Sequence, residues 1–201
     1  MLYSFGFDPD GNFPTAPVLR DPRGNLYGTT QIGGLAGFGT VYKVSPSGSE
    51  LILHEFTGNP DGASPVAGLS RDTQGILYGT TAGGGANNQG TVYNFEIATG
   101  ILTVLHNFGE NSSDGVKPFG GVVLDGAGNI YGTTYNGGLS GCGTVFKLDS
   151  AGQLTNLHSF SCGSDGQFPT AGLFLGPSGS LFGTTIEGGI YGGGVVFQLK
   201  P

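Results

Sequence analysis

The sequence has few charged residues and very few positive ones. Four lysines and three arginines occur among 201 residues, they are spread singly, and the formal net charge is −7. A surface that binds the phosphates of a nucleic acid, or the headgroups of an anionic membrane, needs clustered positive charge. We therefore expect neither nucleic acid nor an anionic membrane surface as a partner.

Long apolar segments are also missing. No run approaches the roughly 18 residues of a membrane span. The first residues, Met1–Phe5, have neither a charged region nor the apolar stretch of a signal peptide. The sequence alone leaves open a protein that stays inside the cell and a mature fragment of an exported one.

Familiar catalytic motifs are absent from the sequence. No phosphate-binding loop, zinc-type cysteine spacing or Ser-His-Asp arrangement is recognisable. Glycosidase chemistry needs a convergent pair of carboxylates. The 14 Asp and Glu residues allow such a pair, but most of the aspartates recur with the repeat described below, which is typical of a scaffold.

Glycine, in contrast, is abundant. The chain has 42 glycines and 11 prolines, a proportion that without a period is typical of disorder. Here the glycines are periodic and alternate with Val, Leu, Tyr and Phe, which indicates a folded repeat. No Gly-x-y triplet runs through the chain, so a collagen helix is excluded.

A tandem repeat organises the whole sequence. The phrase [LI]-[YF]-G-T-T begins at Leu26, Leu77, Ile130 and Leu181, at spacings of 51, 53 and 51 residues. A Gly pair, a G-[TV]-V-[YF] phrase and an Asp-Gly followed by proline keep the same register. We place the repeats approximately at 7–57, 58–109, 110–161 and 162–201 plus 1–6, and expect one domain over 1–201.

Each repeat predicts four short antiparallel strands and almost no helix. In the second repeat we expect strands at 66–71, 76–81, 91–95 and 102–108, because these segments are rich in β-branched and aromatic residues and are bounded by turn residues. Four such strands in about 50 residues are typical of a β-propeller blade. The predicted fold is all-β, a propeller of four four-stranded blades.

The two ends of the chain predict how the ring closes. Leu2–Phe5 aligns with Leu53–Phe56 and so is a fourth strand, whereas the chain ends on a third strand, Val195–Leu199. We expect the amino-terminal strand to pair with the carboxy-terminal blade, which removes an exposed sheet edge. Closure within one chain gives four blades, and closure between two chains gives an eight-bladed homodimeric ring.

The repeat unit resembles the GloVer tandem repeat of bacterial extracellular proteins. The resemblance is best seen from Asp61 to Tyr93, in the pattern D-G-x-x-P…L-Y-G-T-T-x-x-G-G…G-T-V-Y, and it covers nearly the whole chain. It implies export and an extracellular or cell-surface location, and it carries no catalytic residues. The sequence departs from the pattern at Gly176, where other units have Asp, and at Val195, where they have Thr.

Two cysteines, Cys142 and Cys162, lie on either side of the turn at 149–153. A hairpin centred on that turn sets them opposite each other, so a disulfide is feasible. A disulfide fits an oxidising compartment. The alternative is a pair of free, partly buried thiols.

Two sets of repeated residues are candidates for a site. His54, His106 and His158 occupy one position in successive units, so we expect them far apart on the outer rim, with backbone or solvent partners, and not around one metal.

The loop aspartates share one face with the glycine-pair loops. The segment 8–12 faintly resembles a calcium loop without its last carboxylate, which makes calcium a candidate cofactor. The alternative is that each Asp organises its own turn.

We hypothesise a non-catalytic, secreted or surface-displayed propeller for adhesion, scaffolding or assembly, with no cofactor and with a second copy of itself as a partner. The second hypothesis is a lectin-like module that binds glycan, and the third is a carbohydrate-active hydrolase. The candidate ligand-binding residues are Asp10, Asp61, Asp114, Asp165, Asn87, Asn88, Tyr135, Asn136 and Tyr191.

Overall fold

The protein is built from β-strands and turns. The computed structural model describes residues 1–6, 9–111 and 113–201, and this part of the chain contains no helix. Among these residues there is accordingly no helix that could cross a membrane.

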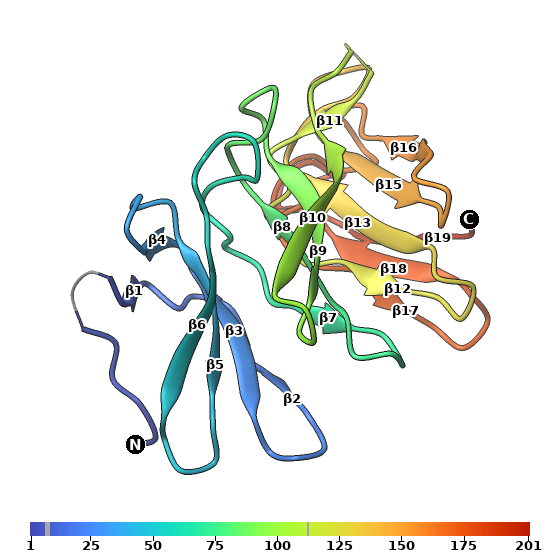
Figure 1. The fold of residues 1–201 in the computed structure, drawn as a ribbon. Helices are drawn as coiled ribbons and strands as arrows, with labels where there is room; N and C mark the ends of the chain where they lie inside the picture. The colour runs from blue at the N-terminus through green and yellow to red at the C-terminus, as the bar shows by residue number, and fades with distance from the viewer. Residues whose placement is uncertain (7–8, 112) are drawn as a thin grey trace.

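Four antiparallel sheets follow one another along the chain, one from each repeat (Figure 1). We call them blades 1 to 4. Blade 1 comprises β2 (Leu19–Arg20), β3 (Leu26–Thr30), β5 (Thr40–Val44) and β6 (Glu50–Glu55). Blade 2 comprises β7 (Ser70–Arg71), β8 (Leu77–Thr81), β9 (Thr91–Glu96) and β10 (Ile101–Asn107). Blade 3 comprises β12 (Val123–Leu124), β13 (Ile130–Thr134), β15 (Thr144–Leu148) and β16 (Leu154–Ser159). Blade 4 has three strands, β17 (Phe174–Leu175), β18 (Leu181–Thr184) and β19 (Val196–Leu199).

The strands predicted for the second repeat are all present. The first is much shorter than expected, because only Ser70 and Arg71 pair with β8. The other three agree with the prediction to within about one residue at each end. All pairings within the blades are antiparallel.

Two small sheets join the loops at one face of the blades. β1 (Gly11–Asn12) pairs with β4 (Ile32–Gly33), and β11 (Gly115–Val116) pairs with β14 (Asn136–Gly137). Isolated bridges tie the same two loops together in the second and fourth repeats. The Asp-Gly loops and the glycine-pair loops therefore lie side by side, as the propeller topology predicts. We call this side the loop face.

The hydrophobic core lies between consecutive blades. One cluster joins blades 1 and 2, a second joins blades 2 and 3, and a third joins blades 3 and 4. The third strands of blades 1 to 3 contribute most, since neighbours cover both of their faces: Val41, Val92 and Val145 are each 0% exposed.

The blades contact one another through three junctions with the same hydrogen bonds. At each junction the first threonine of the G-T-T phrase donates its hydroxyl to a carbonyl of the next blade: Thr29 to Ala67, Thr80 to Gly120 and Thr133 to Ala171. The second threonine pairs with the threonine that opens the third strand of its own blade. These threonines are therefore scaffold residues.

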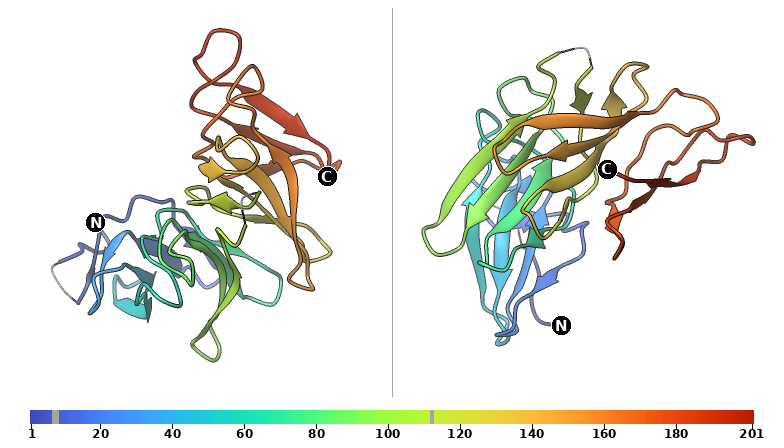
Figure 2. Two further views of the ribbon diagram at one scale, coloured as in Figure 1. Left: turned by 90° about the horizontal axis from the view of Figure 1, so that it is seen from above. Right: turned by 90° about the vertical axis from the view of Figure 1, so that its right-hand side faces the viewer.

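The expected closure of a four-bladed ring within one chain is wrong. Among the described residues β19 has β18 as its only strand partner, and residues 1–6 form no strand. The two termini lie at opposite ends of the row of blades (Figure 1 and the left view of Figure 2). The blades sweep an open arc, so the amino-terminal segment lies far from the blade that lacks a fourth strand.

The disulfide predicted from the hairpin register is present. Cys142 and Cys162 are bonded, with 5.4 Å between their Cα atoms. The bond links the glycine-pair loop of blade 3 to the segment that follows β16. This excludes the alternative of two free thiols.

Candidate functional site

Each Asp-Gly loop places its carboxylate at the end of a fourth strand. Asp61 accepts hydrogen bonds from the backbone N–H of Thr57 at 3.0 Å and from its hydroxyl at 2.7 Å. The other carboxylate oxygen lies 2.9 Å from His54 Nε2. We call this arrangement the Asp hub, because one carboxylate connects the strand, the turn and the imidazole.

The Asp hub recurs in all four repeats. His106 lies against Asp114 and His158 against Asp165, at 3.3 and 3.1 Å. In the first repeat the hydroxyl of Tyr3 donates to Asp10 at 2.8 Å. The histidines are thus separate from one another, as predicted, but their partner is a carboxylate and neither backbone nor solvent.

The hub does not have the connectivity of a nucleophilic triad. In blade 3 the hydroxyl of Ser161 donates to Asp165, the same carboxylate that holds His158. A nucleophilic serine instead needs its hydroxyl to donate to the imidazole. Burial raises the pKa of Asp165, but the hydrogen bonds from Ser161 and His158 outweigh it, and the net pKa is lowered. At neutral pH such a carboxylate is ionised, and its oxygens are already engaged in hydrogen bonds.

Metal ligation has no support in the described part of the chain. No group of three or more His, Cys, Asp or Glu side chains is placed to hold an ion there. Asp8, the first carboxylate of the calcium-like segment, lies outside the described residues. Asp10 accepts from Tyr3 and from the backbone N–H of Gly6, so its contacts are those of a turn.

Two of the three candidate loop asparagines, Asn87 and Asn136, hydrogen-bond to backbone carbonyls. The side chain of Asn87 donates to the carbonyl of Phe108, which anchors its loop, and Asn88 is exposed with a positive φ of 57°. Asn136 sits in β14 and reaches the carbonyl of Gly141 at 3.5 Å. Tyr191, 97% exposed, is at the tip of the last glycine-pair loop.

Tyr135 is the candidate that the structure places in a cluster. Its ring lies 5.1 Å from Phe119, edge to face, and 5.0 Å from Phe168, stacked. All three rings are half-buried, at the loop face between blades 3 and 4. Since the corresponding positions of other repeats are mostly non-aromatic, this aromatic trio breaks the repeat symmetry. Tyr135 was chosen from the sequence, but its partners Phe119 and Phe168 were missed.

Basic residues also gather in a way that the sequence conceals. Arg23, Lys43 and Arg71 are far apart in the chain, yet all three line a groove of about 450 Å³ between blades 1 and 2, together with Asp21 and Glu96. The mixed charges make the groove polar without giving it one sign.

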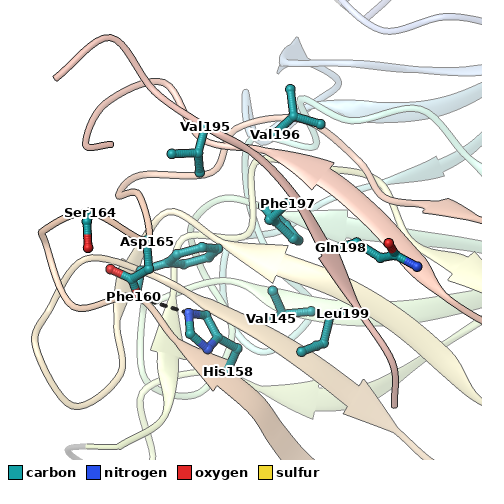
Figure 3. Close-up of a pocket in the computed structure, with 10 residues that line it drawn as sticks. All are labelled: Val145, His158, Phe160, Ser164, Asp165, Val195, Val196, Phe197, Gln198 and Leu199. Carbon is teal, nitrogen blue, oxygen red and sulfur yellow. Dashed lines mark hydrogen bonds and ion pairs between the residues drawn. The ribbon is translucent and has the colours of Figure 1, made fainter. Parts of the chain in front are cut away.

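A second groove lies along the outer edge of blade 4 (Figure 3). It has a volume of about 340 Å³ and is lined by His158 and Phe160 on one side and by Val195–Leu199 on the other. Here the hub pair is more open than elsewhere: the side chain of His158 is 36% exposed, against 11% for His106. The groove exists because no fourth strand covers this edge within the described chain.

The sequence comparison agrees with the repeat pattern. The profile of the Gloeobacter/Verrucomicrobia repeat matches residues 1–125 and again residues 110–201. The chain belongs to this repeat family. The expected resemblance to the GloVer repeat is therefore confirmed. No curated protein matches the chain.

Solved structures similar to this member of the repeat family are propeller proteins. The extracellular domain of a one-component system protein from B. thetaiotaomicron aligns with a TM-score of 0.57 at 14% identity, over 90% of this chain and 21% of its own length. A protein described as a gluconolactonase gives 0.54 at 15%, over 90% and 57%. TolB from Acinetobacter baumannii gives 0.53 at 16%, over 92% and 44%.

These likenesses concern the fold alone. Because the sequence identity is so low, they show only that the repeat forms propeller-like blades. The chain spans between about a fifth and somewhat over half of the length of these three proteins.

Proposed function

We propose that the chain is a non-catalytic module for adhesion, scaffolding or assembly, secreted or displayed on a cell surface. The observation that carries the proposal is the repeated use of one hub. In each repeat the loop carboxylate accepts a hydrogen bond from a backbone N–H of its own turn and contacts a Tyr or His side chain. An enzyme is expected to release one such set for chemistry, and a scaffold is expected to keep all four.

Two further observations support the location. A disulfide joins Cys142 to Cys162, and such bonds persist in oxidising environments such as the cell exterior. The resemblance to a repeat of bacterial extracellular proteins favours the same location. The low positive charge agrees with a partner other than nucleic acid.

A bead-adhesion assay tests this function. In parallel, the hydrolysis of chromogenic substrates is measured. Beads carrying the chain should stay, under flow, on surfaces coated with bacterial envelope polysaccharide or envelope protein, and beads carrying the heat-unfolded chain should not. Chromogenic glycosides and esters should not be turned over. Turnover that disappears when one carboxylate is replaced would contradict the proposal and favour the hydrolase.

A lectin-like role is the second candidate, and the aromatic trio favours it. Half-buried aromatic rings offer apolar area and, in Tyr135, a hydroxyl at low entropic cost, which suits the apolar faces of sugars. The Phe119 and Phe168 rings pack against that of Tyr135 and hold it in place.

A glycan array with two variants tests the lectin role. If the trio binds sugar, Tyr135→Ala should weaken binding about tenfold, a loss of about 1.4 kcal/mol. Tyr191→Ala removes an exposed ring outside the trio and should leave binding unchanged. The reverse pattern would move the site to the loop tip, and an array without signal would remove the lectin hypothesis.

A further inference from the structure

The two ends of the row of blades carry complementary halves of one junction. At each of the three junctions within the chain, a phenylalanine that follows the fourth strand packs edge to face on an aromatic ring of the next blade. The pairs are Phe56–Tyr93, Phe108–Phe146 and Phe160–Phe197, with centroids 5.2, 5.2 and 5.3 Å apart. Phe5 packs on Tyr42 in the same way, at 4.9 Å.

This contact shows what the amino-terminal segment is. Phe5 occupies the position of a phenylalanine from a preceding blade, and Tyr3 forms the hub with Asp10 that His54 forms with Asp61. Residues 1–5 are therefore seated against blade 1 as the outer strand of another blade. Their own edge has no strand partner among the described residues.

Blade 4 presents the opposite deficit. Its third strand, β19, has one free edge within the described chain, and Val196 is 82% exposed, whereas the equivalent Val41, Val92 and Val145 are 0% exposed. An open edge of this kind is a template for a further strand.

The hydrogen bonds of the junction are incomplete in matching ways. Thr184 is exposed and has no acceptor in the described chain, although its equivalents Thr29, Thr80 and Thr133 are at most 2% exposed and each donate to the next blade. The carbonyl that corresponds to their acceptors belongs to Ala16, at the other end of the chain.

A backbone bond follows the same rule. Ser64, Lys117 and Phe168 donate their N–H groups to the carbonyls of Phe38, Gln89 and Cys142 in the preceding blade. The equivalent donor in the first repeat is Phe13, and the equivalent acceptor in the fourth is Gly193. Phe13 shares the positive φ of its equivalents, 57° against 55°, 57° and 59°, so its backbone already has the conformation of the junction.

The glycine-pair loop of blade 4 lacks one more partner. In blades 1 to 3 a residue of the fourth strand accepts a hydrogen bond from the loop tip: Glu55 from Leu35, Asn107 from Ala86 and Ser159 from Leu139. In blade 4 the donor is Ile190, and it has no acceptor in the described part of the chain. The aligned acceptor is Ser4.

We propose that a second copy of this chain supplies these groups, so that two copies form a closed ring with two identical junctions. Residues 1–5 of each copy add to β19 of the other as its fourth strand. The register of the inner blades, in which Val41 faces His54 and Thr40 faces Glu55, sets Val196 opposite Tyr3 and Val195 opposite Ser4. Thr184, Gly193 and Ile190 then meet Ala16, Phe13 and Ser4.

A second copy fits better than another occupant because every missing group is found in the sequence of the chain itself. Since one chain carries one end of each kind, copies that join head to tail either close into a ring or grow into a fibre. The four blades form an open arc, with the two halves of the junction at its two ends (Figure 2). Two copies satisfy both ends with the fewest chains.

Light scattering on the purified chain tests the proposal. The expected mass is that of two chains, twice 20.4 kDa, and Val196→Asp should reduce it twofold to one chain, because the charge would be buried beside Tyr3. Leu139→Asp is the matched control, since Leu139 is also 82% exposed but lies on the loop face. A monomeric parent chain, a mass above two chains, or a dimer that Val196→Asp leaves intact would each overturn the proposal.

Disulfide cross-linking tests the register of the proposed strand pair without introducing a charge into the interface. Chains with Ser4→Cys are mixed with chains with Val195→Cys and oxidised, and a covalent dimer is expected on a non-reducing gel. Gln198→Cys replaces Val195→Cys in the control: it lies three residues along the strand, about 10 Å away, beyond the reach of a disulfide. Equal yields from both mixtures, or no dimer from the first, would contradict the register.

Discussion

The hydroxyl of Tyr3 donates a hydrogen bond to Asp10 at 2.8 Å, in the same place where His54 contacts Asp61 in the next repeat. This hydrogen bond is the largest cause that raises the pKa of Tyr3, to about 12, so the phenol remains a donor at any physiological pH. A phenol in the first repeat and an imidazole in the second thus contact the aspartate at the same place. The constant member of each hub is the aspartate.

The Asp hubs predict loss of stability in acid. Burial raises the pKa of Asp61, but hydrogen bonds from Thr57 and His54 outweigh it and lower the pKa net, as they do for Asp165 with its own partners. A carboxyl with a lowered folded pKa stabilises the fold above its unfolded value of about 3.9 and loses this as the pH falls through the folded value. The melting temperature should therefore fall steeply below about pH 4, as circular dichroism can measure.

Asp61→Asn separates the charge from the shape. The amide can still accept from Thr57, but it lacks the charge, and we expect a loss of about 1 kcal/mol at pH 7. The variant should also lose less between pH 5 and pH 2 than the parent. A parent protein that becomes more stable in acid would contradict this account of the hub.

The repeat register predicts the blades well because period and turn chemistry coincide. The Leu26, Leu77, Ile130 and Leu181 phrases each form the second strand of a sheet. The same register could not decide where the fourth strand of the last blade comes from. Leu2–Phe5 has the right side chains for that strand, but whether it pairs within one chain depends on the angle between blades, which no local pattern encodes.

The candidate site was less predictable than the fold. The loop aspartates were found because they repeat, and repetition turned out to mean a shared structural role. The trio around Tyr135 depends on Phe119 and Phe168, which lie 16 and 33 residues away in different repeats. Its signal in the sequence was the departure of three positions from the repeat, a feature that is visible only when the four units are aligned at these loops.

The glycine of the G-T-T phrase is required by a close approach. A Cβ at Gly79 would lie 2.4 Å from the Tyr93 hydroxyl oxygen, and Tyr93 is fully buried and cannot move aside. We expect Gly79→Ala to destabilise the fold by about 3 kcal/mol, the upper range for overpacking a core. Urea unfolding measures the loss.

Gly126→Ala is the control for this substitution. A Cβ at Gly126 would meet nothing within 4 Å, and its φ is not positive. Alanine there should leave stability unchanged or raise it by up to about 1 kcal/mol, because it restricts the unfolded chain. Equal losses from both variants would show that backbone freedom, and not the Tyr93 ring, requires the glycine.

Tyr93→Phe should stabilise the protein. The Tyr93 hydroxyl is buried, and it has no hydrogen-bond partner in the described part of the chain. An unsatisfied buried group costs about 1–3 kcal/mol, so its removal should add about 1 kcal/mol after the loss of packing. Blades 3 and 4 already have Phe146 and Phe197 at this position.

Tyr27→Phe provides the contrast to Tyr93→Phe. The Tyr27 hydroxyl donates to Asp21 at 3.2 Å, so its removal should cost about 1 kcal/mol and leave a buried carboxylate with one donor fewer. Both variants are compared by urea unfolding at pH 7. A loss from Tyr93→Phe as large as that from Tyr27→Phe would mean that its hydroxyl has a partner after all, such as a bound water.

Removal of the disulfide should destabilise blade 3 without abolishing the fold. Cys142 and Cys162 are 20 residues apart, and closing a loop of this size stabilises a protein by about 3 kcal/mol in the chain-entropy account. Cys142→Ala with Cys162→Ala should lower the melting temperature by about 6–12 °C, at about 2–4 °C per kcal/mol. Reductant should lower that of the parent similarly and leave the double variant unchanged. If reductant shifts both proteins alike, its effect lies elsewhere, and the bond contributes little to the stability of the blade.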